Sequence, residues 1–235
     1  MNIISNYSLN FSKKIRSSRD IKFVIIHYTG MQSEIASINR LKNLKHKVSC
    51  HYLINRKGTI IRMVEDEKIA WHAGKSKWKK FVNLNDYSIG IELVNKGHKL
   101  GYQSFTKNQI KSALNLCKFL KKKYKIRKEN FLGHSDISPL RKEDPGEKFP
   151  WKKFSKHKIG IWYKENKSKL KYDSNNSHIA FFKNLKKIGY KYFSIYKRNH
   201  TDKKIIKSFQ QHYLPNNVSG KIDKKTFKIS HYLTR

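Results

Sequence analysis

The 235-residue sequence has few cysteines and no long apolar run. Its two cysteines, Cys50 and Cys117, cannot form a disulfide framework, and the absence of any CxxC pair argues against a structural zinc site. Cys50 falls in an expected strand and Cys117 on the apolar face of an expected helix, so both are predicted to be small buried hydrophobic residues. No run of about 18 apolar residues is present, so no segment is expected to span a membrane.

Acidic residues are scarce beside basic ones. The sequence has 16 Asp and Glu against 53 Lys and Arg, which gives a formal net charge of +37. Such a charge attracts nucleic acid, anionic membrane surfaces or an acidic wall polymer without choosing among them. A drift toward AT-rich codons would also produce this excess of Lys, so the charge alone assigns no partner.

Apolar strand patterns alternate with amphipathic helical patterns along most of the chain. Strands are expected in IKFVIIHYTG, in NDYSIGIELVN, and in a hairpin, VSCHYLINRKGTIIRMV, that turns at Lys57 and Gly58. One helix is expected after Ser33, and another in FTKNQIKSALNLCKFLKKKY, where Thr106 and Gln109 fit a capping box. The mixture predicts an α/β or α+β fold, with a mixed central β-sheet flanked by helices and functional loops along one edge of the sheet.

A polar, pattern-free stretch near residues 164–176 has the composition of a linker. It predicts a main domain over residues 1–163 and a second, smaller domain over residues 177–235. The smaller domain contains HIAFFKNLKKIGY, DKKIIKSFQQHYL and DKKTFKISHYL, with Asp223 as a helix cap. These three amphipathic segments predict a three-helix bundle.

Most of the eleven histidines are expected to be solvated, because they lie among lysines or on helix surfaces. This group comprises His46, His98, His157, His200, His212 and His231. By contrast, His27 closes an apolar strand, where an unpartnered imidazole would cost about 1–3 kcal/mol. His134 stands at a strand-to-loop transition, FLGHSDISP, and Asp144 lies in LRKEDPGEKFPW, a loop ordered by proline and glycine.

Two imidazoles and one carboxylate with a free fourth position form the donor set of a catalytic zinc site. His27, His134 and Asp144 provide such a set. His51 or Asp136 could replace one member, and a core histidine with ordinary hydrogen bonds is the commoner alternative. The residue types alone therefore leave the ligand set open.

Glu92 interrupts the apolar strand SIGIELVN. An acid in such a strand is rarely buried without a paired cation, a metal or a chemical task. Beside a zinc-bound water it could accept a proton. The alternative is a glutamate on an edge strand that faces solvent.

Six motifs together resemble one family. FVIIHYTG, VSCHYLINRKG, AWHAGKSKW, NDYSIGIELVN, GHSDISPLRKEDPG and FPW, in this order, look like the zinc-dependent N-acetylmuramoyl-L-alanine amidases of the AmpD/AmiD type, the amidase 2 family. The resemblance covers about residues 20–155 and implies the fold that these amidases share with peptidoglycan recognition proteins. LKKIGY, IIKSFQQHY and SGKIDKKT are similar to the small helical peptidoglycan-binding domain that some members carry.

The resemblance implies roles for individual residues. It implies one zinc ion per chain, held by His27, His134 and Asp144. Glu92 matches the general base, and Lys142 matches the cation that stabilises the oxyanion.

The resemblance also implies a substrate groove. Trp71 and His72 are expected to line it, and Asn85 and Asn95 are expected to hydrogen-bond sugar or peptide. Ordinary packing and the bracing of loops are the alternative for these four residues.

The function implied is hydrolysis of the amide between N-acetylmuramic acid, or its anhydro form, and the L-alanine of the stem peptide, in cell-wall turnover or recycling. The expected partners are peptidoglycan or muropeptides, and the expected state is a monomer. A non-catalytic peptidoglycan-binding protein is the alternative. The hypothesis of a nucleic-acid-binding protein rests on the positive charge alone, and no recognition motif for a specific nucleic acid is present.

The compartment is not fixed by the sequence. A wall-binding domain favours the periplasm or cell envelope, which we slightly prefer. The N-terminal segment MNIISNYSLNFSKKIRSSRD lacks the apolar region of a secretory signal, which favours the cytoplasm.

Overall fold

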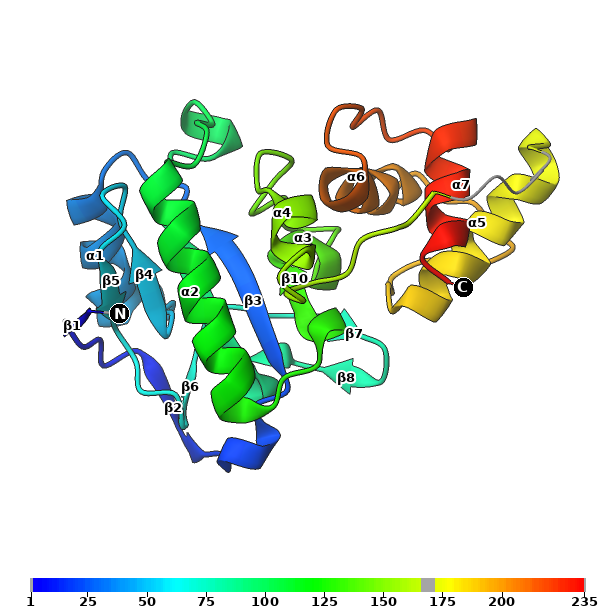
Figure 1. The fold of residues 1–235 in the computed structure, drawn as a ribbon. Helices are drawn as coiled ribbons and strands as arrows, with labels where there is room; N and C mark the ends of the chain where they lie inside the picture. The colour runs from blue at the N-terminus through cyan, green and yellow to red at the C-terminus, as the bar shows by residue number, and fades with distance from the viewer. Residues whose placement is uncertain (1, 166–171, 235) are drawn as a thin grey trace.

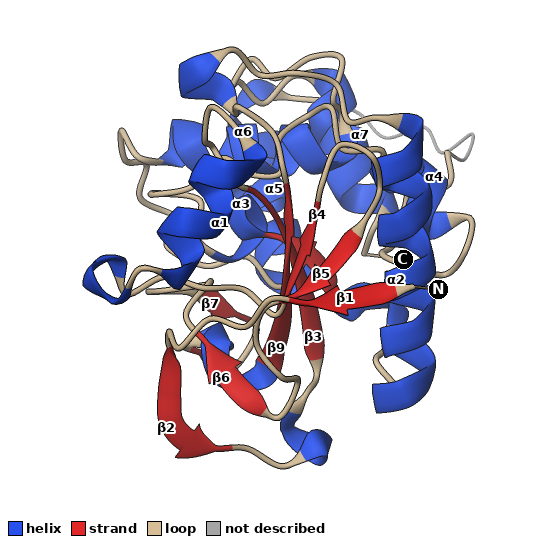
Figure 2. Cartoon of the chain, turned by 90° about the vertical axis from the view of Figure 1, so that its left-hand side faces the viewer, coloured by secondary structure: helices blue, strands red, loops and turns tan. Residues whose placement is uncertain are grey.

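The computed structural model describes residues 2–165 and 172–234. Its centre is a six-stranded mixed sheet, shown from two sides in Figure 1 and Figure 2. In spatial order the strands are β1 (Ile3–Ser5), β5 (Ile60–Arg62), β4 (Tyr52–Ile54), β9 (Ser88–Leu93), β3 (Phe23–Tyr28) and β10 (Phe131–Gly133). Two small two-stranded sheets pair β2 (Phe11–Ile15) with β6 (Lys68–Ala70) and β7 (Lys77–Trp78) with β8 (Phe81–Val82).

The sheet combines a parallel part and a hairpin. β4, β9, β3 and β10 run parallel to one another, whereas β5 is antiparallel to β4. The turn between β4 and β5 uses the side chain of Asn55, whose Oδ1 accepts hydrogen bonds from the N–H groups of Lys57 and Thr59. Gly58 adopts a positive φ of 90° there. The predicted mixed sheet and the predicted hairpin are both confirmed.

Helices cover both faces of the sheet. They are α1 (Glu34–Lys42), α2 (Lys107–Tyr124), α3 (His134–Ile137), α4 (Trp151–Ser155), α5 (Ser174–Ile188), α6 (Asp202–Tyr213) and α7 (Lys224–Tyr232). Figure 2 shows α1 and α2 on opposite sides of the sheet. The predicted capping box begins α2, because Thr106 Oγ1 accepts from Gln109 N–H and Gln109 Oε1 accepts from Thr106 N–H.

Alternation along β3 divides its side chains between two cores. Val24 and Ile26 pack in the cluster beneath α2, which also contains Cys117. Phe23 and Ile25 point to the other face and join a second cluster with the C-terminal helices. Because side chains alternate along a strand, His27 projects from the same face as Phe23 and Ile25, away from α2. The prediction that both cysteines are buried free thiols is confirmed.

The C-terminal helices pack directly against the sheet domain. Phe181 and Phe182 of α5 and Phe209 of α6 share one buried cluster with Phe23 and Leu132. All three helices predicted there are present, at the right of Figure 1. Helix α5 begins at Ser174, inside the stretch expected to be a linker, and residues 166–171 of that stretch lie outside the described residues. The domain boundaries stay a prediction. Among the described residues, no helix has the length and apolar character that crossing a membrane requires.

Candidate active site

Three predicted site residues lie in a row across one edge of the sheet. Glu92 on β9 is the direct register partner of His27 on β3. On the other side of β3, Gly133 of β10 pairs with Ile26. The next residue, His134, therefore lies beside His27. The carboxyl ends of three parallel strands therefore bring these side chains together, as the expected functional edge requires.

The two histidines and Asp144 form a compact donor cluster. His27 Nδ1 and His134 Nδ1 are 2.9 Å apart, and Asp144 Oδ2 lies 3.0 Å from the former and 3.1 Å from the latter. All three side chains are buried. Among the described residues, these three alone form a group of His, Cys, Asp and Glu side chains with metal-ligand spacing.

The outer nitrogens of both imidazoles indicate which ring atoms face the cluster. His134 Nε2 is 3.1 Å from the carbonyl oxygen of Ala73, which can only accept, so Nε2 carries the proton. His27 Nε2 is 3.0 Å from His72 Nδ1. With these protons outward, both Nδ1 lone pairs point toward the Asp144 carboxylate. Three electron-pair donors this close repel one another unless a cation lies among them, so the donor set fits a metal ion.

His72 continues this hydrogen-bond chain. Its Nε2 is 3.2 Å from Ser88 Oγ, and the Ser88 hydroxyl donates in turn to the carbonyl of Leu84. If His27 donates to His72 Nδ1, then every donor in the chain meets an acceptor. Gly90 makes room for the ring, because a Cβ at that position would lie 2.4 Å from His72 Cγ.

The electrostatics also suit a cation. Burial and the neighbouring His134 lower the pKa of His27 to about 4. Burial alone would raise the pKa of Asp144, but His134 and His27 outweigh it and hold that pKa well below its usual range. At neutral pH the cluster therefore offers a neutral His27 imidazole and an ionised carboxylate, which are the forms that bind metal.

The loop that carries Asp144 is held by its backbone. The Asp144 carbonyl accepts from Ser135 N–H at 2.8 Å, and the Pro145 carbonyl accepts from the Tyr102 hydroxyl at 2.5 Å. Gly146 has a φ of 78°, and a Cβ there would lie 2.6 Å from Tyr102 Oη. A side chain at position 146 would therefore push this loop away from Tyr102.

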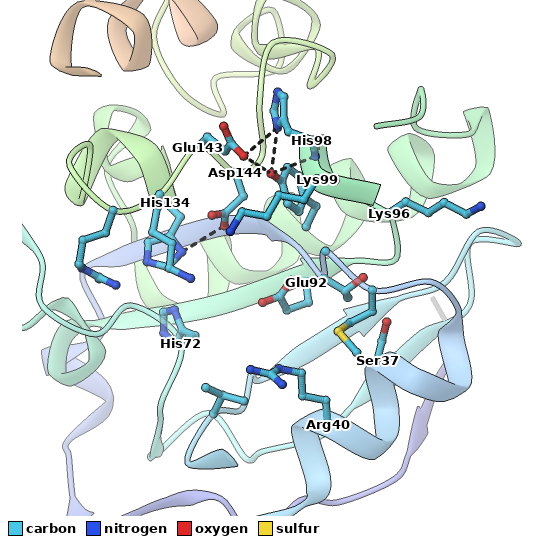
Figure 3. A pocket seen from close by; sticks show the side chains of 18 of the residues that line it. Ser37, Arg40, His72, Glu92, Lys96, His98, Lys99, His134, Glu143 and Asp144 are labelled. Carbon is cyan, nitrogen blue, oxygen red and sulfur yellow. Dashed lines mark hydrogen bonds and ion pairs between the residues drawn. The ribbon is translucent and has the colours of Figure 1, made fainter. Parts of the chain in front are cut away.

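Glu92 faces the cleft from β9. Burial raises its pKa to about 8; the Asp144 charge adds to this rise and the Lys142 charge opposes it. Its Oε2 has no hydrogen-bond partner within the described part of the chain. Figure 3 shows Glu92 in the same pocket as His72, His134 and Asp144. A carboxyl group of this kind, partly desolvated and free of a fixed donor, is suited to accept and release a proton.

The cleft around these residues has a volume of about 600 Å³ and is lined by seven Lys and Arg side chains against three acids. Lys142 is exposed on the wall of the cleft. Its positive charge makes a small contribution at the site: it opposes the rise in the pKa of Glu92 and adds to the lowering of the pKa of His27. Trp71 and His72 also line the cleft, and their role in substrate binding stays a prediction.

Asn85 and Asn95 are not among the residues that line the cleft. Asn85 Oδ1 accepts from the N–H groups of His72 and Ala73, at 3.1 and 2.7 Å. Asn95 Nδ2 donates to the carbonyl of Gln103 at 2.8 Å. Both amides brace the loops beside the cleft.

The two alternative ligands have other partners. His51 Nδ1 accepts from Gly90 N–H at 2.9 Å, and its Nε2 lies 3.1 Å from the carbonyl of Lys68. Asp136 is held by Gly133 N–H, by the Tyr190 hydroxyl and by His212 of α6.

The expectation that the six dismissed histidines are solvated is wrong for His98 and His212, and His231 is half-buried with its Nε2 out of contact with solvent. His98 is partly buried, with Nε2 3.0 Å from Glu147 and Nδ1 2.9 Å from the Tyr28 hydroxyl, and lines the cleft. His212 is only 3% exposed. It lies seven residues after Ile205 and three after Phe209 on α6, a spacing that predicts a position on the apolar face of the helix. This signal could have identified it as buried.

Comparison with known proteins agrees with this geometry. Residues 17–147 match the N-acetylmuramoyl-L-alanine amidase family. The chain is 32% identical to the N-acetylmuramoyl-L-alanine amidase AmiD of Escherichia coli, over 91% of this chain and 82% of AmiD. It is 42% identical to the 1,6-anhydro-N-acetylmuramyl-L-alanine amidase AmpD of Haemophilus influenzae, over 63% of this chain and 87% of AmpD.

Two solved structures share the fold over nearly the whole chain. One is E. coli AmiD in complex with the substrate anhydro-N-acetylmuramic acid-L-Ala-D-γ-Glu-L-Lys, with a TM-score of 0.77 and 30% identity, covering 94% of this chain and 91% of AmiD. The other is AmpDh3 of Pseudomonas aeruginosa in complex with anhydromuramic pentapeptide, with a TM-score of 0.79 and 29% identity, covering 91% of both chains.

Proposed function

The chain belongs to the N-acetylmuramoyl-L-alanine amidase family, and on that premise we propose that His27, His134 and Asp144 hold one zinc ion for amide hydrolysis. The bond cleaved joins N-acetylmuramic acid, or its anhydro form, to the L-alanine of the peptidoglycan stem peptide, in cell-wall turnover or recycling. The cluster of two inward Nδ1 atoms and one carboxylate oxygen carries this proposal.

A bound zinc ion supplies Lewis-acid chemistry, which polarises the substrate carbonyl and acidifies water. The protein supplies the proton transfers. Glu92 accepts a proton from the attacking water and delivers it to the nitrogen of the leaving amine, and its desolvated, unpartnered carboxyl group supports this role. The Lys142 ammonium stabilises the negative charge that develops on the carbonyl oxygen.

The cleft supplies substrate binding. Trp71 and His72 line its wall, while Asn85 and Asn95 act through the loops that they brace. The excess of cations in the cleft favours stem peptides, because those peptides carry free carboxylates. We propose that a monomer acts on muropeptides or peptidoglycan in this cleft.

For the domain organisation, we propose an amidase unit over residues 1–163, a linker over 164–176 and a peptidoglycan-binding-like unit over 177–235. The sequence patterns of the last three helices support the third unit. Sedimentation of the full chain with purified peptidoglycan tests it, and a chain that stays in the supernatant at low and moderate salt contradicts it.

Digestion of defined muropeptides tests the enzymatic proposal. Intact and anhydro muropeptides are incubated with the protein as purified, after chelation, and after zinc is restored, and products are identified by mass spectrometry. We expect release of the free stem peptide, loss of release on chelation, and recovery with zinc. Binding of muropeptide without cleavage under all three conditions would instead support the non-catalytic alternative.

A further inference from the structure

Asp136 is a buried carboxylate close to the proposed metal ligands, and the mechanism above does not use it. It lies two residues after His134 in the four-residue helix α3 and is 1% exposed. Its Oδ2 accepts a hydrogen bond from Gly133 N–H at 2.7 Å. This bond closes the turn from which the His134 side chain projects. A single helical turn has little stability of its own, so its geometry depends on such contacts.

The other donors to Asp136 come from the C-terminal part of the chain. The Tyr190 hydroxyl, just after α5, donates to Oδ1 at 2.5 Å. His212 Nδ1, on α6, lies 2.7 Å from Oδ2. An ionised carboxylate only accepts, so we assign the His212 proton to Nδ1. Tyr190 and His212 lie 54 and 76 positions after Asp136 in the sequence. They complete the hydrogen bonds of the Asp136 side chain, close to His134.

The His212 ring is fixed on both sides. It stacks on Trp151 with ring centroids 4.1 Å apart and an interplanar angle of 11°, and on Tyr213 at 4.1 Å and 19°. Its Nε2 is buried and has no hydrogen-bond partner in the described ranges. Burial of an unpartnered polar atom is unfavourable, so packing alone would be served better by an apolar ring at this position. The hydrogen bond to Asp136 is the contact that an apolar ring could not make.

The turn held by Asp136 also touches the second ligand segment. Ser135 N–H, next to Asp136, donates to the carbonyl of Asp144 at 2.8 Å. A shift of α3 would therefore move His134 directly and Asp144 through its backbone. Two of the three proposed ligands depend on one turn, and that turn is tied to the C-terminal helices.

We propose that His212 and Tyr190 are positioning residues for the metal centre, acting through Asp136 on the turn that carries His134. The C-terminal helices are then part of the catalytic unit, whether or not they also bind the cell wall. The inference rests on the proposed zinc role of His134. It goes beyond that role because it assigns two residues outside the amidase unit to the geometry of the site.

Three variants and a control test it in the full chain. His212→Phe keeps a ring of similar size for the stack but removes the donor, and Tyr190→Phe removes one hydroxyl. His212→Asn restores an N–H close to the position of Nδ1. Ile205→Val, on the same helix and fully buried, weakens packing without touching Asp136.

The readouts are the zinc dissociation constant from chelator competition, the visible spectrum of the Co²⁺-substituted protein, kcat and KM. We expect both Phe variants to weaken zinc binding by about 10-fold or more, the scale found for outer-shell partners of metal ligands. They should also alter the Co²⁺ bands and lower kcat with little change in KM. His212→Asn should recover most of the loss, and Ile205→Val should lower Tm alone.

Wild-type zinc affinity and Co²⁺ spectrum in a folded His212→Phe variant would overturn the inference while leaving the proposed function intact. If that variant does not fold, the same readouts on Tyr190→Phe decide. Absence of zinc binding by the wild-type chain would overturn the proposed function, and the inference with it.

Discussion

His27 and Glu92 are register partners on the neighbouring parallel strands β3 and β9. Neighbouring strands lie about 4.8 Å apart, so the proposed ligand and the proposed base are held side by side by backbone hydrogen bonds. Both side chains project from the face opposite α2, where β9 otherwise carries only Ser88 and Gly90. The sheet itself therefore sets the distance between metal centre and base.

Glu92→Gln should abolish most of the activity and leave the metal in place. The amide is close in size to the carboxyl group but cannot take a proton from water, so we expect kcat to fall by about 10²–10⁴-fold. Zinc content by elemental analysis should match the wild type. Glu65 is an exposed acid that pairs with Lys68, three residues later, and it does not line the cleft. Glu65→Gln is therefore the matched control and should keep full activity. Substantial turnover by Glu92→Gln would remove Glu92 from the mechanism.

Gly90→Ala should disturb His72. The added Cβ would meet the His72 ring at 2.4 Å, a distance that forces the ring to move. We expect a destabilisation of about 1–3 kcal/mol, the usual range for overpacking, together with weaker zinc binding because His27 loses its hydrogen-bond partner. Chemical denaturation and chelator competition measure the two effects.

The double variant Gly90→Ala, His72→Ala separates the clash from the loss of the ring. Because the second substitution removes the atoms that clash, the two stability changes should not add, and the double variant should be more stable than their sum predicts. Simple additivity would show that the alanine at position 90 acts elsewhere.

Stability should fall with acid partly because of His51. Burial and then the charge of Arg16 lower the pKa of His51 to about 3 in the folded protein, whereas the unfolded chain titrates near about 6.5. Between these two pKa values the unfolded state binds more protons than the folded state. The stability that neutral His51 contributes is therefore fully present above about pH 6.5 and is lost as the pH falls toward 3.

Urea denaturation of the metal-free protein at several pH values measures this slope. His51→Asn keeps an acceptor for Gly90 N–H but does not titrate, so its free energy of unfolding should depend less steeply on pH than that of the wild type. Parallel curves for the two proteins would contradict the assignment.

The strands were predictable because their signals are local, whereas the ligand set was implied by the family resemblance, since the residue types alone left it open. Apolar runs ended at His27 and just before His134, and parallel strands that end at one edge bring such residues together. The capping box of α2 and the turn at Gly58 likewise depend on residues within one segment. The same logic placed Asp144 in a loop ordered by proline and glycine.

Contacts between distant segments were not predictable in this way. His212 looked like a surface residue because lysines surround its helix, yet it meets Asp136 across 76 positions. Asn85 and Asn95 carried no sign that their amides bond to backbone rather than face the cleft. A side chain's partner depends on tertiary packing, which a single sequence does not encode in any local pattern.

The cationic cleft should steer anionic substrate. Lys207 of α6 lines the cleft, whereas Lys203, on the same helix, does not. We expect Lys207→Gln to raise KM several-fold at low ionic strength with kcat unchanged, and Lys203→Gln to have a smaller effect. Added salt should raise the wild-type KM and reduce the difference, because salt screens exposed charges. A KM that does not respond to ionic strength would rule out steering.

Removal of metal should lower thermal stability as well as activity. Without a cation, two Nδ1 lone pairs and the Asp144 carboxylate face one another at 2.9–3.1 Å, which destabilises the folded state. A ligand that binds only the folded state stabilises that state by RT ln(1 + [L]/Kd). Calorimetry should therefore show Tm rising with zinc concentration after chelation. His27→Ala should fold with a Tm that no longer responds to zinc, and Glu92→Gln should keep the response. A zinc-dependent Tm that persists in His27→Ala would place the metal elsewhere in the protein.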